Sequence, residues 1–220
     1  RRPAGLSWKA GQHGVFTLPG VRVRGRSYRV FSIASAPSDE ILRIATRIRT
    51  PVSDFKRHLL ELGAGDRVSM RGPLGPFYIH DPSRPVVFVA AGIGITPFLG
   101  MLRDRRARHT VVPESIDLVY GVWKDVYPFR DEVEQACDEL PGFTAFPRAE
   151  PAEVRSCVRE MAELRKNDAD YFVSGEFAVV RSLKKTLRRC GIARSRIRSD
   201  WFSGYGGASD ARRPEEGMER

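Results

Sequence analysis

The stretch VVFVAAGIGITPF, residues 86–98, decides the fold class of this chain. Residues 86–91 form an unbroken apolar run rich in valine, which is typical of a parallel strand buried on both faces. The Gly-Ile-Gly that follows lets the backbone turn tightly at the end of that strand. Thr96 and Pro97 then suit the start of a helix, as its cap and its first residue. The stretch therefore predicts a strand, a glycine turn and a helix N-terminus.

A strand, turn and helix of this kind form a common binding site for phosphate. The first N–H groups of a helix have no partner within the helix, and its N-terminal end carries a partial positive charge. Gly92 and Gly94 match two glycines of the dinucleotide-binding fingerprint, and Pro97 stands in place of the third. A tight turn without a ligand is the alternative. The strand before the glycines and the helix start after them favour phosphate binding.

Strand and helix patterns alternate after residue 83, which predicts a doubly wound, Rossmann-like parallel sheet. Apolar strand patterns follow at 116–122, 143–146 and 170–175, and helical patterns begin near 97 and cover 129–140, 151–164 and 178–190. We therefore expect a second domain over 83–206. The segment 207–220 is rich in charge and small residues and is predicted to be a disordered tail.

Residues 1–82 show short strand patterns in place of alternating strands and helices. This pattern predicts a first domain built on an antiparallel sheet or small barrel. Glycine and proline separate short strand patterns at 12–19, 27–35, 41–48 and 66–72. One helix is expected over 53–62, with Ser53 as its N-cap and with Phe55, Leu59 and Leu62 on one face.

The stretch SYRVFSIASAP, residues 27–37, carries the chemistry of this first half. Arg29 can form a bidentate contact with a phosphate, Phe31 can stack on a planar ring, and Ser32 offers a hydroxyl. Alternation along a strand places Ser32 on the face opposite Arg29 and Phe31 unless the strand ends there. The alternative is a half-buried strand with a surface arginine.

The net charge and the cysteines limit the partners and metal sites that we expect for this chain. The 220 residues carry a net charge of +10, which could attract nucleic acid, an anionic membrane or an acidic protein. The charges are dispersed and no nucleic-acid motif accompanies them, so we expect no nucleic-acid partner. Cys137, Cys157 and Cys190 are far apart, without a CxxC pair, which argues against a metal or iron–sulfur site and indicates a reducing compartment such as the cytoplasm.

Taken together, the motifs RVFSIAS, GDRVSMRGPLGPF, AAGIGITP, VSGE and DWFSGY resemble those of the ferredoxin–NADP reductase superfamily of flavoproteins. They follow the family order from Gly11 to Tyr205. The resemblance implies an antiparallel flavin-binding β-barrel in the first domain, a nucleotide-binding α/β domain in the second, and an enzyme that uses FAD and NAD(P)H. Because family members normally have a further strand ahead of Gly11, and because the chain begins with Arg1, we expect it to be the C-terminal part of a longer protein.

The resemblance also implies roles for individual residues. Arg29 would hold the flavin pyrophosphate, Phe31 would line the isoalloxazine in place of the commoner tyrosine, and Ser32 would reach its N5 edge. The other residues implied for FAD are Val30, Ile44, Thr46, Arg47, Val52 and Ser53. The NAD(P)H site would comprise Gly92, Gly94, Ile95, Thr96, Pro97 and Gly175.

Four of the residues assigned by resemblance are predicted to take part in catalysis, namely Ser32, Thr96, Ser174 and Phe202. Asp200 and Phe202 would lie beside the flavin ring. Ser174 and Glu176 stand where the family has cysteine and proline.

The implied reaction passes a hydride from NAD(P)H to FAD and then single electrons to an acceptor. The acceptor would be an acidic ferredoxin, or a haem or quinone partner on the cytoplasmic side of a membrane. A non-catalytic FAD-binding regulatory module is the alternative, favoured by Phe31 and Glu176. Lys124 and Arg130 give a weak preference for NADPH, whereas Asp125 would suit NADH.

Overall fold

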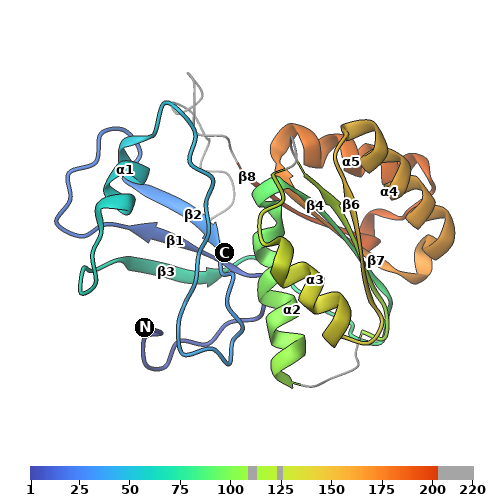
Figure 1. The fold of residues 1–220 in the computed structure, drawn as a ribbon, viewed down its shortest axis with the longest axis horizontal. Coiled ribbons are helices and arrows are strands. Elements are labelled where there is room, and N and C mark those ends of the chain that lie inside the picture. The colour runs from blue at the N-terminus through green and yellow to red at the C-terminus, as the bar shows by residue number, and fades with distance from the viewer. Residues whose placement is uncertain (109–112, 123–125, 203–220) are drawn as a thin grey trace.

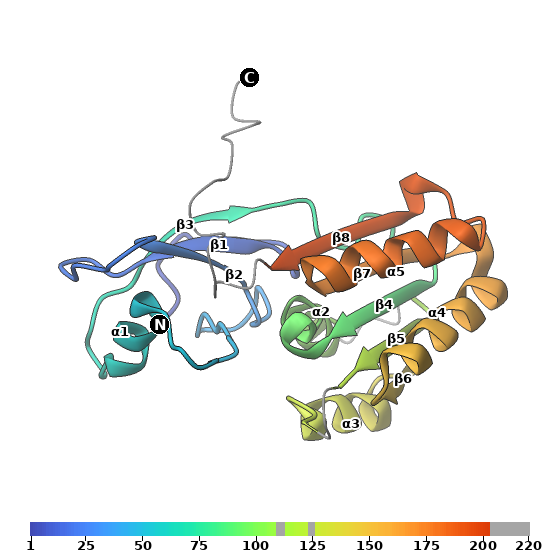
Figure 2. The same cartoon turned by 90° about the horizontal axis from the view of Figure 1, so that it is seen from above.

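The computed structural model describes residues 1–108, 113–122 and 126–202, which form two halves that pack side by side (Figure 1). The first half has an antiparallel sheet and a short helix, and the second has a parallel sheet with helices on both faces (Figure 2). The predicted fold class is confirmed. Within the described ranges, no helix is both long and apolar enough to cross a membrane.

The second half follows the predicted alternation. Its elements are β4 (Val86–Ala91), the 3₁₀ turn η1 (Gly92–Ile95), α2 (Thr96–Arg108), β5 (Ile116–Gly121), α3 (Arg130–Glu139), β6 (Phe143–Arg148), α4 (Pro151–Arg165), η2 (Lys166–Asp168), β7 (Asp170–Glu176), α5 (Phe177–Arg189), η3 (Arg194–Arg196) and β8 (Ile197–Phe202). The strands are parallel in the order β6-β5-β4-β7-β8. β8 is the one strand of this sheet that the alternating pattern did not single out.

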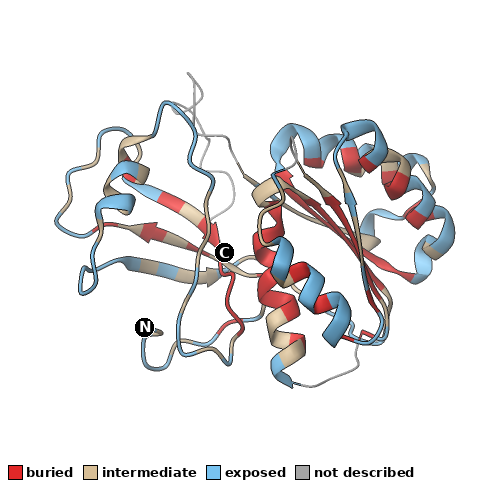
Figure 3. Ribbon diagram, viewed as in Figure 1, coloured by how far each residue is buried: buried red, intermediate tan, exposed pale blue. Residues whose placement is uncertain are grey.

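The core of the second half lies on the two faces of β4, which is the centre of the sheet. Phe88 packs with Phe98 of α2 on one face, while Val87 and Val89 pack with α4 and α5 on the other. The side chains of 86–90 are completely buried, as the continuous apolar run predicts (Figure 3).

The first half contains β1 (His13–Thr17), β2 (Tyr28–Ser32), α1 (Asp54–Glu61) and β3 (Ser69–Leu74). Its three strands are antiparallel in the order β2-β1-β3. Phe55 of α1 is completely buried against Phe16 and Phe31 of the sheet. The predicted helix is confirmed to within a residue at each end, and Leu59 and Leu62 lie partly buried against the same cluster.

The prediction of a strand over 41–48 is wrong, because this segment pairs with no strand of either sheet. The backbone of Arg43 binds the segment that follows β2. Its carbonyl accepts from the Ala34 N–H at 2.9 Å, and its N–H donates to Ser35 Oγ at 3.1 Å. Leu42 and Ile44 pack on the Phe55 cluster. The apolar alternation that predicted a strand is therefore explained by packing under α1 without strand pairing.

The two halves share part of a core, which fixes how their sites face each other. Phe77 precedes the predicted boundary at residue 82, yet its ring centre lies 5.7 Å from that of Phe98 and 5.3 Å from that of Phe172 in the second half. Arg103 of α2 donates to the Ala34 carbonyl at 2.7 Å and forms a bidentate pair with Glu132. The junction is thus packed and hydrogen-bonded.

Candidate functional site

A hydrogen bond between the two halves marks the centre of the site. Ser32, at the end of β2, is buried, and its Oγ donates to Asp200 Oδ2 on β8 at 3.0 Å. Strand register brings further polar residues to the same place, because His13 is paired with Ser32 across β1 and β2, and Ser174 with Asp200 across β7 and β8. Side chains from four strands therefore converge where the halves meet.

The electrostatics at this junction are those of a buried acid with polar neighbours. Burial raises the pKa of the Asp200 carboxyl, while the His13 ring and the Ser32 hydroxyl act in the opposite direction. His13 Nδ1 and Ser174 Oγ are buried without a hydrogen-bond partner among the described residues. Because buried polar atoms are nearly always hydrogen-bonded, these two atoms are available to a bound group.

The helical segment after β4 begins earlier in the chain than predicted. The 3₁₀ turn η1 runs directly into α2, so the helical segment begins at Gly92. Thr96 was expected to cap this helix, and that expectation is wrong, because its Oγ1 donates to the Ile93 carbonyl at 3.0 Å, inside the helical segment. Ile95, Thr96 and Pro97 are all buried, so their side chains support the turn from inside the protein.

The two glycines of the turn serve different purposes. Gly92 has φ +52°, and a Cβ there would meet no atom within 4 Å, so its Cα borders open space. A Cβ on Gly94 would collide with the Ser174 carbonyl. Gly175 has φ +152°, and a Cβ there would lie 2.8 Å from the Ala91 Cβ. Gly94 and Gly175 thus allow the ends of β4 and β7 to pack closely, whereas Gly92 is the position open to a ligand.

Arg29 lies inside the first half, with only 2% of its surface exposed, so it is not a surface arginine. Its Nη1 donates to the carbonyls of Arg26 at 2.7 Å and Tyr28 at 2.8 Å, and its guanidinium lies 5.2 Å from the centre of the Phe55 ring. The buried charge is therefore held beside α1 by backbone carbonyls at the start of its own strand and just before it.

The N-terminus of α1 completes an anion-binding arrangement next to Arg29. Ser53 takes the predicted N-cap position but its side chain makes no capping bond. Its Oγ is buried without a partner among the described residues. A phosphate group fits this combination of a buried cation, a helix N-terminus and an unused hydroxyl.

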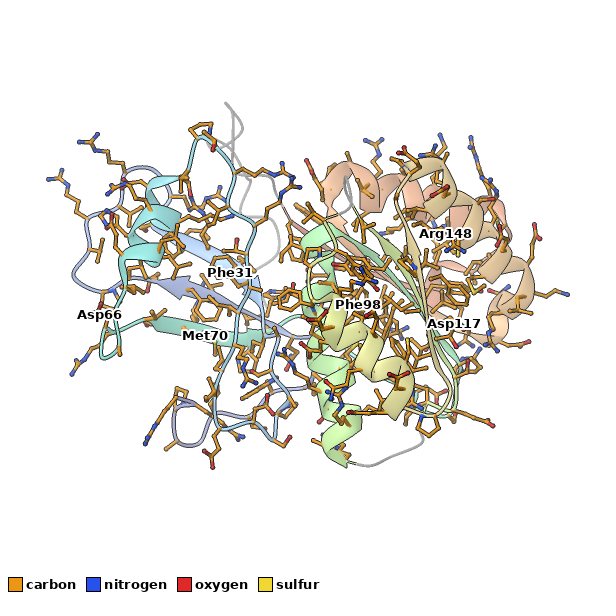
Figure 4. All side chains as sticks on the ribbon, viewed as in Figure 1. Phe31, Asp66, Met70, Phe98, Asp117 and Arg148 are labelled. Atoms are coloured by element: carbon orange, nitrogen blue, oxygen red, sulfur yellow. The ribbon has the colours of Figure 1, made fainter. Side chains whose placement is uncertain are left out.

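The remaining residues predicted for FAD lie around this arrangement in varied environments. Phe31 is 7% exposed, and its ring centre lies 5.6 Å from that of Phe16 and 6.4 Å from that of Phe55, so its ring belongs to the core of the first half (Figure 4). Val30, Ile44 and Thr46 are partly buried, and Arg47 and Val52 are exposed.

The carboxyl end of β7 contacts the first half through an ion pair that the sequence did not predict. Glu176 Oε2 lies 3.2 Å from Arg49 Nη2, and both side chains are about half exposed. Phe202 is paired in register with Glu176 at the end of β8 and is partly buried. His13 and Arg49 were both missed, because only tertiary contacts distinguish them from other polar surface residues.

Some predictions fall elsewhere in the molecule. Lys124, Asp125, the end of the DWFSGY motif and the tail 207–220 lie outside the described residues. Arg130 Nε pairs with Glu134 at 2.7 Å on its own helix. All three cysteines belong to the described part of the chain, and none of them forms a disulfide.

An open pocket of about 460 Å³ lies at the carboxyl end of β6 and the first turns of α4. It is lined by Pro147, Arg148, Ala149, Glu153, Ser156 and Glu160. Figure 4 labels Arg148 at this edge of the second half. Because β4 and β6 belong to one parallel sheet, the pocket lies at the same edge of the sheet as the glycine turn, and ligands of open α/β sheets bind at this edge.

The fold and these features give two candidate sites for phosphate-bearing ligands, one in each half, on either side of the Ser32–Asp200 contact. Comparisons with known proteins show what the chain is similar to. No family model matches the chain. The flavohemoprotein of Bacillus subtilis is 26% identical over 211 residues, which cover 87% of this chain and 51% of that protein. The reductase subunit of an aromatic O-demethylase from Amycolatopsis is 34% identical over 151 residues, covering 64% and 43%.

The fold matches that of ferredoxin–NADP⁺ reductase from Plasmodium falciparum, with a TM-score of 0.75 at 18% identity over 89% of this chain and 84% of that one. The chain spans about half the length of the flavohemoproteins it matches. Its relatives and structural neighbours are ferredoxin–NADP reductase-like flavoproteins, and the chain is similar to them, as its sequence motifs predicted.

Proposed function

We propose that this chain is the reductase part of a flavoprotein, which binds FAD in its first half and NAD(P)H in its second and transfers electrons to a one-electron acceptor. The Ser32–Asp200 hydrogen bond is the observation that carries this proposal, because it places the strand predicted to line the flavin against the carboxyl ends of β7 and β8. The names of the relatives, which include a reductase subunit and flavohemoproteins, support the same activity.

FAD, when bound, accepts a hydride and releases electrons one at a time, so the protein needs to supply only binding, orientation and electrostatics. Arg29 and the N-terminus of α1 hold the diphosphate. Asp200 accepts the Ser32 hydroxyl hydrogen and so fixes the direction of that hydroxyl at the junction. A fixed hydroxyl helps to keep the reacting partners in one geometry. Such positioning accounts for much of the rate enhancement at sites of this kind.

The second half orients the nicotinamide nucleotide. Gly92 leaves room for a pyrophosphate at the start of the helical segment, where N–H groups are free to bind it. Ser174 and Gly175 would hold the nicotinamide end of the nucleotide next to Asp200, which is paired in register with Ser174, and Phe202 would border the same region from the end of β8. Thr96 contributes by holding the turn through its bond to Ile93.

We also propose a preference for NADPH, with Arg148 as the residue that binds the 2′-phosphate. The ribose of the adenosine lies toward β6 when the pyrophosphate occupies the β4 turn. Arg148 Nη1 donates to the neighbouring Pro147 carbonyl, and the side chain also interacts with the Cys157 thiol, which leaves further guanidinium donors for a ligand. Glu153 in the same pocket is engaged with the Glu150 N–H at 3.3 Å, as part of the α4 capping box.

The charge distribution supports an acidic electron-carrier protein, such as a ferredoxin, as the acceptor. Residues 1–82 carry 14 lysines and arginines against 6 aspartates and glutamates, so the first half holds +8 of the net charge of +10. Opposite charge accelerates encounter between redox partners at low ionic strength. A haem or quinone partner on the cytoplasmic side of a membrane is the second acceptor class within the proposal.

The function is tested by mixing the FAD-loaded protein with NADPH or NADH under anaerobic conditions and following flavin absorbance. We expect rapid bleaching, faster with NADPH, and transfer of electrons to an added acidic ferredoxin that slows as salt is added. A protein that holds FAD firmly but is bleached by neither nucleotide would instead be a regulatory FAD-binding module.

A further inference from the structure

The last segment of the described chain, residues 177–202, forms a basic surface on the second half. It comprises α5, η3 and β8 and contains eight lysines and arginines and one acidic residue, Asp200, so its net charge is +7. The Asp200 carboxylate accepts from Ser32 at the junction between the halves. Figure 2 shows α5 beside β8, with the carboxyl end of β8 directed at the first half.

Most of the cations on this surface have no carboxylate partner within the described chain. Arg196 and Arg198 both pair with Asp170, and Lys184 donates to Ser199 Oγ at 3.0 Å. The other five are exposed and form no ion pair with a described residue; they are Arg181, Lys185, Arg188, Arg189 and Arg194. These five charges are therefore available to an anionic partner.

The charges on α5 are spaced so that they lie together. Phe177, Arg181, Lys185 and Arg189 are four residues apart, so they form one row along the exposed side of the helix. Like charges four residues apart destabilise a helix. This row therefore does not serve the stability of α5, and a negatively charged partner would relieve the repulsion.

An exposed aromatic pair lies at the end of this row nearest the first half. Phe177 is 49% exposed and Trp201 is 37% exposed, and their ring centres are 5.0 Å apart. Val179, in the same turn of α5 as Phe177, is exposed as well. An exposed apolar patch with a polar rim is typical of an interaction site, and aromatic and arginine side chains are enriched in protein interfaces.

The aromatic pair borders two contacts that join the halves at the candidate site. Phe177 follows Glu176, which pairs with Arg49 of the first half, and Trp201 follows Asp200, which accepts from Ser32. A partner that covers the two rings would therefore lie next to the junction where we propose that the nicotinamide and the flavin meet. Electron transfer between proteins slows steeply with distance, so this position suits a redox partner better than a membrane or a nucleic acid.

We propose that the α5–β8 surface, made of the Phe177–Trp201 pair and the five exposed cations, is the docking site for an acidic one-electron carrier protein. This inference rests on the proposed function and adds to it the place where the carrier binds. A second copy of this chain is a poorer occupant, because two such surfaces would bring like charges together. Each NADPH would supply two electrons, so two carriers would dock in turn, each accepting one electron, with release of NADP⁺ and one proton.

The first test measures electron transfer from the FAD-loaded protein and NADPH to plant-type ferredoxin, an acidic carrier, and to dichlorophenolindophenol, a small dye. In the variant Arg181→Gln/Lys185→Gln/Arg189→Gln, kcat/KM for ferredoxin should fall about tenfold at low ionic strength, mainly through a higher KM. The difference should disappear in about 0.5 M salt, where charges are screened within a few ångströms. Flavin bleaching by NADPH and reduction of the dye should not change.

The matched control removes the same number of charges from the first half, in the variant Arg22→Gln/Arg67→Gln/Arg71→Gln. All three arginines are exposed, and Arg67 adjoins Asp66, which Figure 4 labels at the end of the first half far from the second. We expect kcat/KM for ferredoxin to fall at most about twofold, because the charges lie beyond the docking site. Equal losses in the two variants would overturn the docking site in favour of a general attraction by net charge.

Phe177→Ala tests the aromatic pair without changing charge. The KM for ferredoxin should rise severalfold at every salt concentration, because an apolar contact is not screened. Phe177 is half exposed, so the unfolding temperature should stay close to that of the wild type. An unchanged KM would exclude the rings from the interface and overturn the docking site as defined here.

A readout independent of turnover is cross-linking with a carbodiimide, which joins carboxylates of ferredoxin to lysine amines of this chain. We expect a cross-link at Lys185, on the surface, and none at Lys9, an exposed lysine of the first half. Cross-links at Lys9 without Lys185 would overturn the docking site. Loss of binding to phosphatidylserine vesicles in the triple α5 variant, with unchanged ferredoxin kinetics, would assign the surface to a membrane instead. A wild type whose flavin is bleached by neither nucleotide would overturn the proposed function itself.

Discussion

Ser32 Oγ and Asp200 Oδ2 lie 3.0 Å apart, although 168 residues separate them in the chain and each belongs to a different half of the molecule. The serine is in the segment whose motif resembles a flavin-binding strand, and the aspartate is at the carboxyl end of the outermost parallel strand, β8. This hydrogen bond connects the two candidate nucleotide sites.

Asp200→Asn should weaken function without weakening the fold. In the folded protein the carboxyl keeps its proton to a higher pH than in the unfolded chain, because burial raises its pKa. Its contribution to stability is therefore present at low pH and is lost as pH rises through the folded pKa. At pH 8 the neutral amide removes that cost, so thermal stability should equal or exceed that of the wild type. Bleaching of the flavin by NADPH should slow at least tenfold, as measured by stopped flow.

Arg29→Ala should release FAD. The substitution removes a charge-assisted contact worth about 1.5–3 kcal/mol, so the dissociation constant for FAD should rise at least tenfold. Fluorescence titration measures it, with circular dichroism as the check on folding, because Arg29 is also a buried side chain of the first half. An unchanged dissociation constant would show that the diphosphate binds elsewhere.

Gly92→Asn and Gly94→Ala should have different consequences. Asparagine tolerates the positive φ at residue 92 and extends into open space, so it should raise the KM for NAD(P)H while FAD content and thermal stability persist. Alanine at residue 94 meets the Ser174 carbonyl and should lower thermal stability, since the turn must move away from β7. Equal effects of the two variants on stability would contradict this division of roles.

Arg148→Ala should reduce the preference for NADPH over NADH. Loss of a contact between arginine and phosphate should lower kcat/KM for NADPH about tenfold and leave that for NADH unchanged. Arg155→Ala on α4, the helix that follows β6, is the control, because Arg155 does not line the pocket. If both nucleotides are affected equally, the 2′-phosphate is not bound by Arg148.

The Arg49–Glu176 ion pair should contribute little to stability despite its position between the halves. Both side chains are about half exposed, and pairs of this kind contribute about 1 kcal/mol or less. A double-mutant cycle with Arg49→Gln and Glu176→Gln, followed by chemical denaturation, should give a coupling energy within that limit. A substantially larger coupling energy would identify the pair as a structural link between the halves.

Much of the fold was predictable because its signals are local. β4 was recognisable as an unbroken apolar run, and a strand buried on both faces needs such a run. β8 was not, because its sequence IRSDWF mixes charged and aromatic residues at the edge of the sheet. The segment 41–48 was wrongly predicted as a strand. Its apolar alternation reflects packing of Leu42 and Ile44 under α1, and no strand pairs with it.

The candidate site divides in the same way. Arg29, Ser53 and the glycine turn could be named from the chain alone, because each motif places its residues within a few positions of one another. Only the tertiary structure reveals that Asp200 holds Ser32, that Gly94 packs on β7, and that Phe177 and Trp201 form an exposed pair. Those properties depend on strand register and on contacts between residues far apart in the chain, and spacing along a sequence contains no direct record of either.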